Sequence, residues 1–393
     1  MTSDSTHALP PSTTLELRVP RAHLVDTTMF WSPAGGGVAR YLRDKRRWAL
    51  RHAQWRHSWV VPGNCTGGDI GIDGVSIPFS GGYRFPLRRG QAARLIAQLE
   101  PDLIEAGDPY RLAWSALDAA QRCGVPAATF CHSNLAEVAR RYFGTVAAAA
   151  ARAYLRKLLR NFDAVFAASR WMVDEVRGLG LDNVVHQPLG VDLQQFNPSR
   201  RDPAWRRALG LKPEAIVLLY VGRFAREKNL RVLCEMVDRL GDDYVLVAKG
   251  AGPAPPQGAR VRVLPYDADP RAVATAMASA DIFVHAGTME TFGLAPLESL
   301  ACGTPVVLPA CGGFLDLIDG RTAVGVAHAT GDALAAGVRS LDLSDRAGVS
   351  AAAVEVARPY DERRTFTRLF ACYAALRQAG TRVGESIGGL RVG

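Results

Sequence analysis

Residues 281–308 limit the fold of this chain more than any other stretch. Residues 281–286 are mostly apolar and predict a buried strand, a helix is expected from about residue 292 to 302, and residues 305–308 predict a second strand. Gly303 can adopt the left-handed conformation that ends a helix, and the proline at 305 prevents the helix from continuing. The carboxyl edge of a sheet built this way is where open α/β folds bind ligands.

Two carboxylates accompany the start of this helix. Glu290 lies before it and Glu298 about two turns inside it. A carboxylate can accept two hydroxyl hydrogen bonds, so the pair suits a sugar and a ribose. The first N–H groups of the expected helix, those of Phe292, Gly293 and Leu294, would lack helical partners and favour an anion such as phosphate. Taken alone, the pair is explained equally well by a Glu that favours the helix dipole and a Glu on a solvated face.

A longer pattern separates these interpretations. Residues 290–294 (Glu-Thr-Phe-Gly-Leu), with Glu298 and then residues 301–307, resemble the nucleotide-sugar motif of retaining glycosyltransferases of family 4, also called group 1. The resemblance covers residues 23–376. It implies an α/β protein of the GT-B fold, in which two Rossmann-like domains face a central cleft and the C-terminal helix crosses back to the first domain.

The length of 393 residues agrees with two domains, because single hydrophobic cores rarely grow beyond about 250–300 residues. By the resemblance, residues 21–196 form the acceptor domain and residues 197–360 the nucleotide-sugar domain. A helix over residues 361–378 returns to the first domain. Residues 1–20 are rich in Ser, Thr and Pro and are expected to form a disordered tail.

The composition narrows the partners and the compartment. A net charge of +9 indicates anionic partners, namely nucleotide phosphates, an anionic membrane surface or nucleic acid. The seven cysteines show no Cys-x-x-Cys spacing, which favours reduced thiols and no metal site. No signal peptide or spanning segment is recognised. We therefore expect a cytoplasmic location, with peripheral attachment to the inner face of the cytoplasmic membrane left open.

The N-terminal half is expected to face the acceptor. A strand over residues 23–30, a glycine-rich loop and a helix over 38–52 are predicted, and the resemblance places Gly36 and Gly37 over the donor diphosphate. A strand over 125–131 ends at His132. A lone histidine is usually structural, but the resemblance implies that His132 forms a hydrogen bond to the transferred sugar or on its acceptor side. Asp108, after the preceding strand, is a candidate acceptor-side carboxylate.

Two stretches of this half are strongly basic. Residues 40–56 hold seven Lys or Arg, one Asp and interspersed Trp, and residues 138–162 hold six Lys or Arg and no acid. Adhesion to anionic lipid and a solvated basic face over buried Trp explain the first stretch equally well. Nucleic acid is not expected as a partner, because neither stretch belongs to a recognisable recognition fold.

The C-terminal half carries two cations after a continuous apolar run. Residues 215–221 predict a central parallel strand, which leads to Arg223 and Lys228. Arg can bind a pyrophosphate bidentately and Lys acts as a compact charge; loop charges in solvent are the plain alternative. The string resembles the diphosphate site of the family. Tyr266, after a strand over 260–264, lies where relatives hold the nucleobase, whereas Lys249 departs from the family pattern.

The resemblance implies a reaction. A hexose would pass from a UDP- or GDP-sugar to a lipid-linked, lipid or glycan acceptor, with retention and without metal or cofactor. Arg223, Lys228 and the helix start would stabilise the departing diphosphate. Glu298 would hold the ribose and Glu290 the sugar. No covalent nucleophile is recognised, and the resemblance implies a front-face mechanism. The alternatives are a nucleotide-sugar 2-epimerase of the same fold and a non-enzymatic, basic membrane-binding protein.

Overall fold

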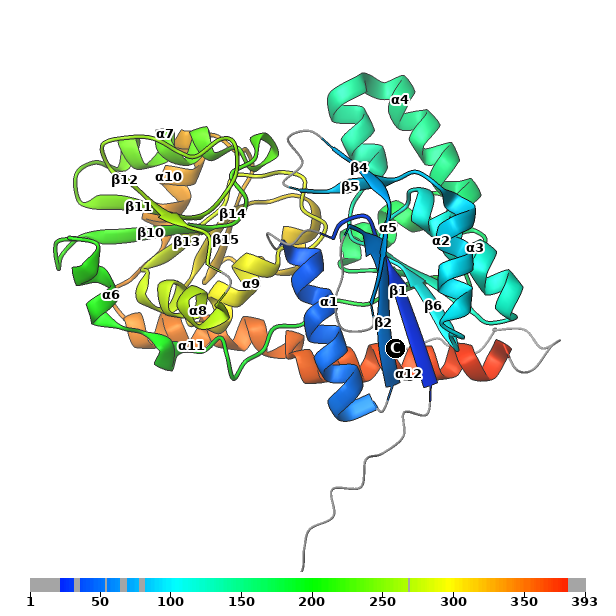
Figure 1. Cartoon of the computed structure of the whole chain (residues 1–393). Coiled ribbons are helices and arrows are strands. Elements are labelled where there is room, and N and C mark those ends of the chain that lie inside the picture. The colour runs from blue at the N-terminus through cyan, green and yellow to red at the C-terminus, as the bar shows by residue number, and fades with distance from the viewer. Residues whose placement is uncertain are drawn as a thin grey trace, which may run out of the picture.

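The computed structural model of the chain describes residues 22–31, 36–53, 55–63, 69–77, 82–267 and 269–380. Two α/β domains stand beside each other, each built around one parallel sheet (Figure 1). The expected disordered tail over residues 1–20 lies outside the described residues. None of the described helices is long and apolar enough to cross a membrane.

The N-terminal domain has a seven-stranded sheet in the order β3-β2-β1-β6-β7-β8-β9. Neighbouring strands pair in parallel, and the inner strands are buried along their length, as parallel strands covered by helices must be. The strands are β1 Ala22–Thr27, β2 Trp55–Pro62, β3 Ile70–Ile72, β6 Leu103–Ala106, β7 Ala127–Cys131, β8 Ala164–Ala167 and β9 Val184–His186. The helices are α1 Gly37–Trp48, α2 Arg89–Gln98, α3 Arg111–Cys123, α4 Leu135–Leu159 and α5 Arg170–Arg177.

The C-terminal domain repeats this plan with a six-stranded sheet in the order β12-β11-β10-β13-β14-β15. The strands are β10 Ile216–Val221, β11 Tyr244–Gly250, β12 Val261–Pro265, β13 Ile282–Val284, β14 Val306–Pro309 and β15 Ala323–Val326. The helices are α6 Pro203–Ala208, α7 Leu230–Leu240, α8 Pro270–Ser279, α9 Leu294–Ala301, α10 Gly331–Ser340, α11 Arg346–Ala357 and α12 Glu362–Gly380. Two such sheets with covering helices are the expected pair of Rossmann-like domains.

The last helix crosses back to the first domain, as expected. α11 and α12 pass beneath both domains (Figure 1). At the crossing, the N–H of Val191 donates to the carbonyl of Tyr360 at 2.8 Å, and the N–H of Glu362 donates to the carbonyl of Val191 at 2.9 Å. A Cβ on Gly190 would lie 2.3 Å from Thr365 Oγ1, so only glycine allows this approach. The crossing therefore joins the end of the first domain to the start of α12.

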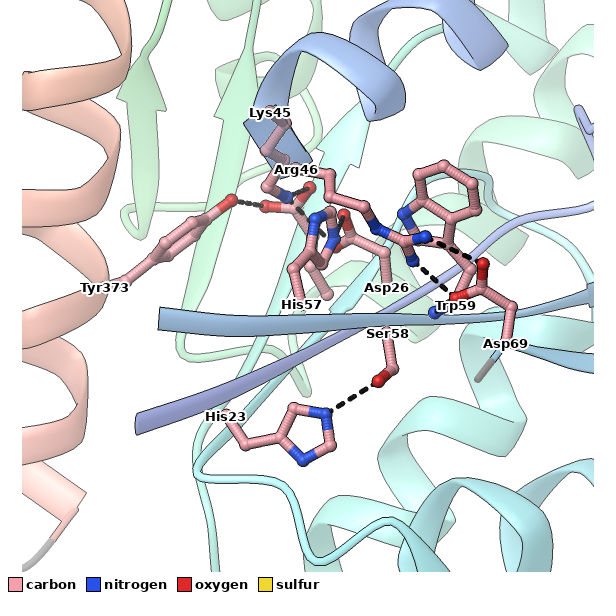
Figure 2. Close-up of polar contacts among 10 residues, drawn as sticks. His23, Asp26, Lys45, Arg46, His57, Ser58, Trp59, Asp69 and Tyr373 are labelled. Atoms are coloured by element: carbon pink, nitrogen blue, oxygen red, sulfur yellow. Dashed lines mark hydrogen bonds and ion pairs between the residues drawn. The ribbon is translucent and has the colours of Figure 1, made fainter. Parts of the chain in front are cut away.

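A buried polar cluster ties α1 and α12 to the first sheet (Figure 2). The fully buried Lys45 Nζ lies 2.9 Å from Asp26 Oδ1 and 2.7 Å from Glu105 Oε1. His57 Nε2 lies 2.7 Å from Asp26 Oδ2, and the Tyr373 hydroxyl donates to Glu105. Burial, opposed by Lys45, raises the pKa of Glu105 to about 7. A cation between two carboxylates fixes the position of α1, which also carries Arg40.

This cluster accounts for part of the basic stretch over residues 40–56. Lys45 points inward, and Arg46 pairs with Asp69 and lies with its guanidinium carbon 3.4 Å from the centre of the Trp59 ring. Trp55 and Trp59 are buried. Three of the seven cations, Arg40, Lys45 and Arg46, therefore have acidic partners that are nearly buried. The other four are exposed, and adhesion of this stretch to anionic lipid stays a prediction.

Other elements also depart from expectation. A separate two-stranded sheet, which was not predicted, is formed by β4 Gly74–Ser76 and β5 Arg84–Pro86, which pair antiparallel. The strand expected over residues 23–30 ends at Thr27. The long α4 was not predicted, because its Ala-rich and Arg-rich sequence lacks a clear amphipathic pattern.

Candidate active site

The centre of the site is an ion pair between two loops of the C-terminal domain. Lys228 ends a short 3-10 turn, Arg226–Lys228, that follows β10, and its Nζ pairs with the Glu290 carboxylate from the loop after β13. Both side chains are about one-fifth exposed. Although burial opposes it, Lys228 holds the pKa of Glu290 below its usual value. Two residues 62 positions apart thus form one charged unit at the carboxyl edge of the sheet.

His285 adds a third group that the sequence analysis missed. Its Nδ1 accepts a hydrogen bond from the N–H of Gly287 at 3.0 Å, and its Nε2 lies 3.5 Å from Glu290 Oε1. Burial lowers the pKa of His285 to about 4, so the ring is neutral at pH 7 and carries its proton on Nε2, toward Glu290. His285 could have been predicted as a site residue, because it directly follows the apolar residues 282–284, whose strand ends at the ligand-binding edge of the sheet.

Arg223 lies on the open side of the same loop. Its guanidinium is exposed and pairs with Glu227 at 2.9 Å. The Tyr220 hydroxyl donates to the carbonyl of Arg223 at 2.9 Å, which holds the main chain here. Across the cleft, the Tyr83 ring centre lies 6.0 Å from the Arg223 guanidinium carbon. Arg226, which was not assigned to the site, is exposed.

The helix start expected at Phe292 is displaced by two residues. α9 begins at Leu294, and Gly293 is its N-cap with φ 111°, a conformation that favours glycine. A Cβ on Gly293 would also lie 2.7 Å from the Phe314 ring. Phe292 is buried, with its ring centre 5.6 Å from that of Tyr360. The helical first turn therefore starts with Leu294, and Phe292 contributes its side chain to the core.

Glu298 lies inside α9 and is almost fully buried. Its Oε1 lies 2.8 Å from Arg40 Nη1, which comes from α1 of the other domain. Burial, opposed by Arg40, raises the pKa of Glu298 to about 7. Arg40 was read only as part of a basic stretch, and its pairing could not be found from sequence because the two residues belong to different domains.

His132 stands on the opposite wall of the cleft. The Thr291 hydroxyl donates to the carbonyl of His132 at 3.1 Å, so this wall touches the motif that contains Glu290. The His132 ring stacks on Phe130, with centres 4.4 Å apart, and meets the edge of Tyr41. Burial lowers the pKa of His132 to about 3, which keeps the ring neutral at pH 7.

Asp108 follows β6 at the same edge of the sheet, and its carboxylate binds main-chain N–H groups. Its two oxygens accept hydrogen bonds from the N–H groups of Met29 at 2.6 Å and Tyr110 at 3.0 Å. Burial raises its pKa to about 6. Asp108 therefore organises two loops of the acceptor wall, and its contact with an acceptor stays a prediction.

The remaining predicted residues lie at the start of α1 and after β12, and their contact with the donor stays a prediction. Gly36 is the N-cap of α1 with φ 118°, and Gly37 is exposed with open space around its α-carbon; residues 32–35 of this loop lie outside the described residues. Tyr266 is 45% exposed after β12. Lys249, which departs from the family pattern, lies 3.7 Å from Asp267.

Comparison with known proteins agrees with this geometry. Residues 23–195 match Glycosyltransferase Family 4, and residues 201–347 match Glycosyl transferases group 1. A GDP-mannose-dependent alpha-(1-6)-phosphatidylinositol dimannoside mannosyltransferase of Mycobacterium tuberculosis is 32% identical over 75% of this chain and 81% of its own length. A GDP-mannose-dependent alpha-mannosyltransferase of Corynebacterium glutamicum is 29% identical over 57% of this chain, which spans 55% of that relative.

Solved structures share the fold at low identity. Sucrose-phosphate synthase from Thermosynechococcus elongatus has a TM-score of 0.73 at 20% identity and covers 91% of this chain and 100% of its own. HepE from Anabaena, solved with UDP and glucose, has a TM-score of 0.70 at 18% identity and covers 90% of this chain and 99% of its own.

Two Rossmann-like domains that face one cleft, joined by a returning C-terminal helix, define the GT-B class. The chain belongs to the family 4, group 1 glycosyltransferases, which are enzymes that use nucleotide-sugar donors. The interpretation as a non-enzymatic membrane-binding protein is therefore wrong.

Proposed function

We propose that this enzyme transfers mannose from GDP-mannose, with retention of the anomeric configuration, to a lipid-anchored acceptor. The names of the two mannosyltransferase relatives support the donor, and the phosphatidylinositol-based acceptor of one of them supports the acceptor class. The net charge of +9 agrees with an acceptor at an anionic surface.

The ion pair of Lys228 with Glu290 carries this proposal. A bound nucleotide sugar has an anionic diphosphate and a hydroxyl-rich sugar side by side, and this pair presents a cation and a hydrogen-bond acceptor side by side. Lys228 would bind the diphosphate and Glu290 the sugar hydroxyls. Glu298, after leaving Arg40, would accept hydrogen bonds from the ribose hydroxyls.

The chemical task is to stabilise negative charge on the departing diphosphate. The bond from the anomeric carbon to the diphosphate oxygen breaks, the acceptor oxygen forms the new bond on the same face, and the acceptor proton leaves with the diphosphate. Lys228, Arg223 and the N–H groups at the start of α9 would oppose the developing charge. This provides charge compensation from the chain itself, so we expect transfer without an added metal.

Neutral His132 and His285 would border the sugar from opposite walls. The carbonyl of His132 contacts Thr291, and His285 directs its Nε2 proton toward Glu290. An uncharged imidazole can donate to a sugar hydroxyl without competing with Lys228 for the diphosphate. Both residues would therefore orient the sugar, and neither is required to form a covalent bond to it.

The test is transfer with purified full-length protein. A thermal-shift panel of GDP, UDP, ADP and their sugars first identifies the base, since a ligand at about 100 times its Kd adds roughly 2.7 kcal/mol. Labelled GDP-mannose is then incubated with lipid acceptors, with and without EDTA, and the product anomer is assigned by NMR. GDP release that requires an acceptor, with an α product, is expected. GDP release without acceptor would favour the 2-epimerase alternative, and an inverted product or loss of activity in EDTA would contradict the mechanism.

A further inference from the structure

The unpredicted helix α4 is broken at its middle. Asn134 caps its start by accepting a hydrogen bond from the N–H of Glu137 at 3.0 Å. At Gly144 the main chain has φ 83° and ψ −173°, which is outside the helical region. The two arms rise from the N-terminal domain and meet in a bend at the top of the view (Figure 1). We call this bend, residues 140–146, the α4 tip.

The α4 tip exposes large apolar side chains. Phe143 is 77% exposed and Val146 is 83% exposed, the highest values among the large hydrophobic residues in the described part of the chain. Tyr142, beside them, is 50% exposed. All seven residues of the tip are exposed. Exposed apolar side chains that gather at one place commonly mark an interaction site.

Two cations, Arg140 and Arg141, lie beside this apolar group, and three more lie farther along the second arm of α4. α4 contains five basic residues and one acid, a net charge of +4, and the acid, Glu137, is paired with Arg140 at 2.6 Å. Arg140 and Arg141 precede the aromatic residues in the tip itself. Basic residues beside exposed aromatic and aliphatic side chains fit an anionic bilayer surface, where the cations meet the headgroups and the apolar groups enter the boundary of the acyl chains.

The position of the tip relates it to the cleft. α4 starts three residues after His132, and Arg141 Nη1 lies 3.5 Å from Thr288 Oγ1, in the loop that leads to Glu290. The same helix thus runs from the acceptor wall to the tip, and Arg141 of the tip contacts the loop that leads to Glu290. A lipid surface held at the tip would lie next to the mouth of the cleft.

We propose that the α4 tip docks on an anionic phospholipid bilayer, with Phe143 and Val146 inserted at the interface. The tip is a bend of seven residues and offers little area, whereas a stable protein interface buries about 800 Å² on each partner. The inference that the tip docks on a bilayer does not depend on the proposed function. The delivery of a lipid-anchored acceptor from this surface to the cleft rests on the proposed function.

Flotation of the full chain with vesicles tests the docking. The wild type is compared with the double variant Phe143→Ser/Val146→Ser on phosphatidylcholine vesicles with and without 30% phosphatidylglycerol, a composition chosen for charge. The control is Leu87→Ser/Val263→Ser, which removes one exposed apolar residue of comparable size from each domain. Thermal melting establishes that all three proteins are folded.

We expect binding that requires phosphatidylglycerol and weakens with salt, an at least tenfold loss in the tip variant, and no change in the control. Equal flotation of the tip variant and the wild type would overturn the proposal. Failure of the wild type to bind at low salt would also overturn it. So would light scattering that shows a dimer in the wild type and a monomer in the tip variant, because the tip would then join two copies of the chain.

A second readout separates this inference from the proposed function. Transfer to an acceptor embedded in vesicles should fall at least tenfold in the tip variant, while transfer to its deacylated, water-soluble form should be unchanged. Loss with both forms would overturn the surface role of the tip. If the wild type binds vesicles through the tip but transfers to neither form, the docking stands and the proposed function fails.

Discussion

Arg40 of the N-terminal domain and Glu298 of the C-terminal domain form an ion pair across the cleft, with Nη1 and Oε1 2.8 Å apart. Glu298 is buried, and Arg40 also lies with its guanidinium carbon 4.7 Å from the centre of the Phe196 ring, near the junction of the two domains. The carboxylate proposed to hold the ribose is therefore the partner of an arginine from the other domain. Under the proposed function, donor binding exchanges this arginine for the ribose hydroxyls.

Donor affinity should increase with pH through about 7. Burial raises the pKa of Glu298 from 4.5 to about 7, and the ionised form is the better acceptor for ribose hydroxyls. The free energy of unfolding of the protein alone depends on pH in the opposite direction. Because the pKa of Glu298 is higher in the folded than in the unfolded state, this group stabilises the fold fully below pH 4.5, and the contribution is lost as pH rises through 7. Calorimetric titration with the nucleotide sugar from pH 5.5 to 8.5 measures the affinity. The diphosphate diester stays fully ionised throughout this range.

The variant Glu298→Gln should remove this pH dependence and bind the donor roughly tenfold more weakly, since hydrogen bonds to a charged group contribute about 1.5–3 kcal/mol. Its circular dichroism spectrum serves as the control for folding. A pH profile identical to that of the wild type would show that another group titrates.

The variant Arg40→Met should move the midpoint of the same pH profile upward. Burial raises the pKa of Glu298 and Arg40 opposes that increase, so removing the cation leaves burial unopposed. Arg40→Lys keeps the charge and should restore most of the original midpoint. An unchanged midpoint in Arg40→Met would mean that the pair does not form in solution.

Lys228→Ala should reduce kcat for transfer by about 100-fold or more, because removing one preorganised group that stabilises transition-state charge has an effect of this size. Arg226→Ala is the matched control, since Arg226 is a cation of the same turn with an exposed side chain. Steady-state transfer assays on both variants give the comparison. Near-normal turnover of Lys228→Ala would exclude this residue from the diphosphate site.

Lys45→Met should destabilise the protein by about 3–5 kcal/mol, because it leaves the buried carboxylates of Asp26 and Glu105 without their cation. Lys157→Met, at an exposed position of α4, should change stability by less than about 0.5 kcal/mol. Urea unfolding followed by fluorescence measures both. Equal midpoints would mean that the cluster in Figure 2 contributes little to the free energy of unfolding.

The strands and helices could be predicted from the sequence because their patterns are local, and the resemblance to the glycosyltransferase family supplied the arrangement of two domains. The apolar run at residues 215–221 became β10, and the strand–helix–strand order at residues 281–308 became β13, α9 and β14. Gly303 ends α9 with φ 76°, as its place after the helix indicated. Lys228 and Glu290 could be named separately for the same reason, since each follows a strand that ends at the ligand-binding edge of one sheet.

Only the tertiary structure decided which charges meet. Lys45, Arg46 and Arg40 look alike in the sequence, yet Lys45 is buried between carboxylates, Arg46 is paired under a Trp ring, and Arg40 reaches the other domain. The physical reason is that burial and pairing depend on residues 19 to 258 positions away, which no local pattern contains. The sequence by itself thus determined the class of fold and the donor motif, and the packing of the two domains determined the state of each charged group in the cleft.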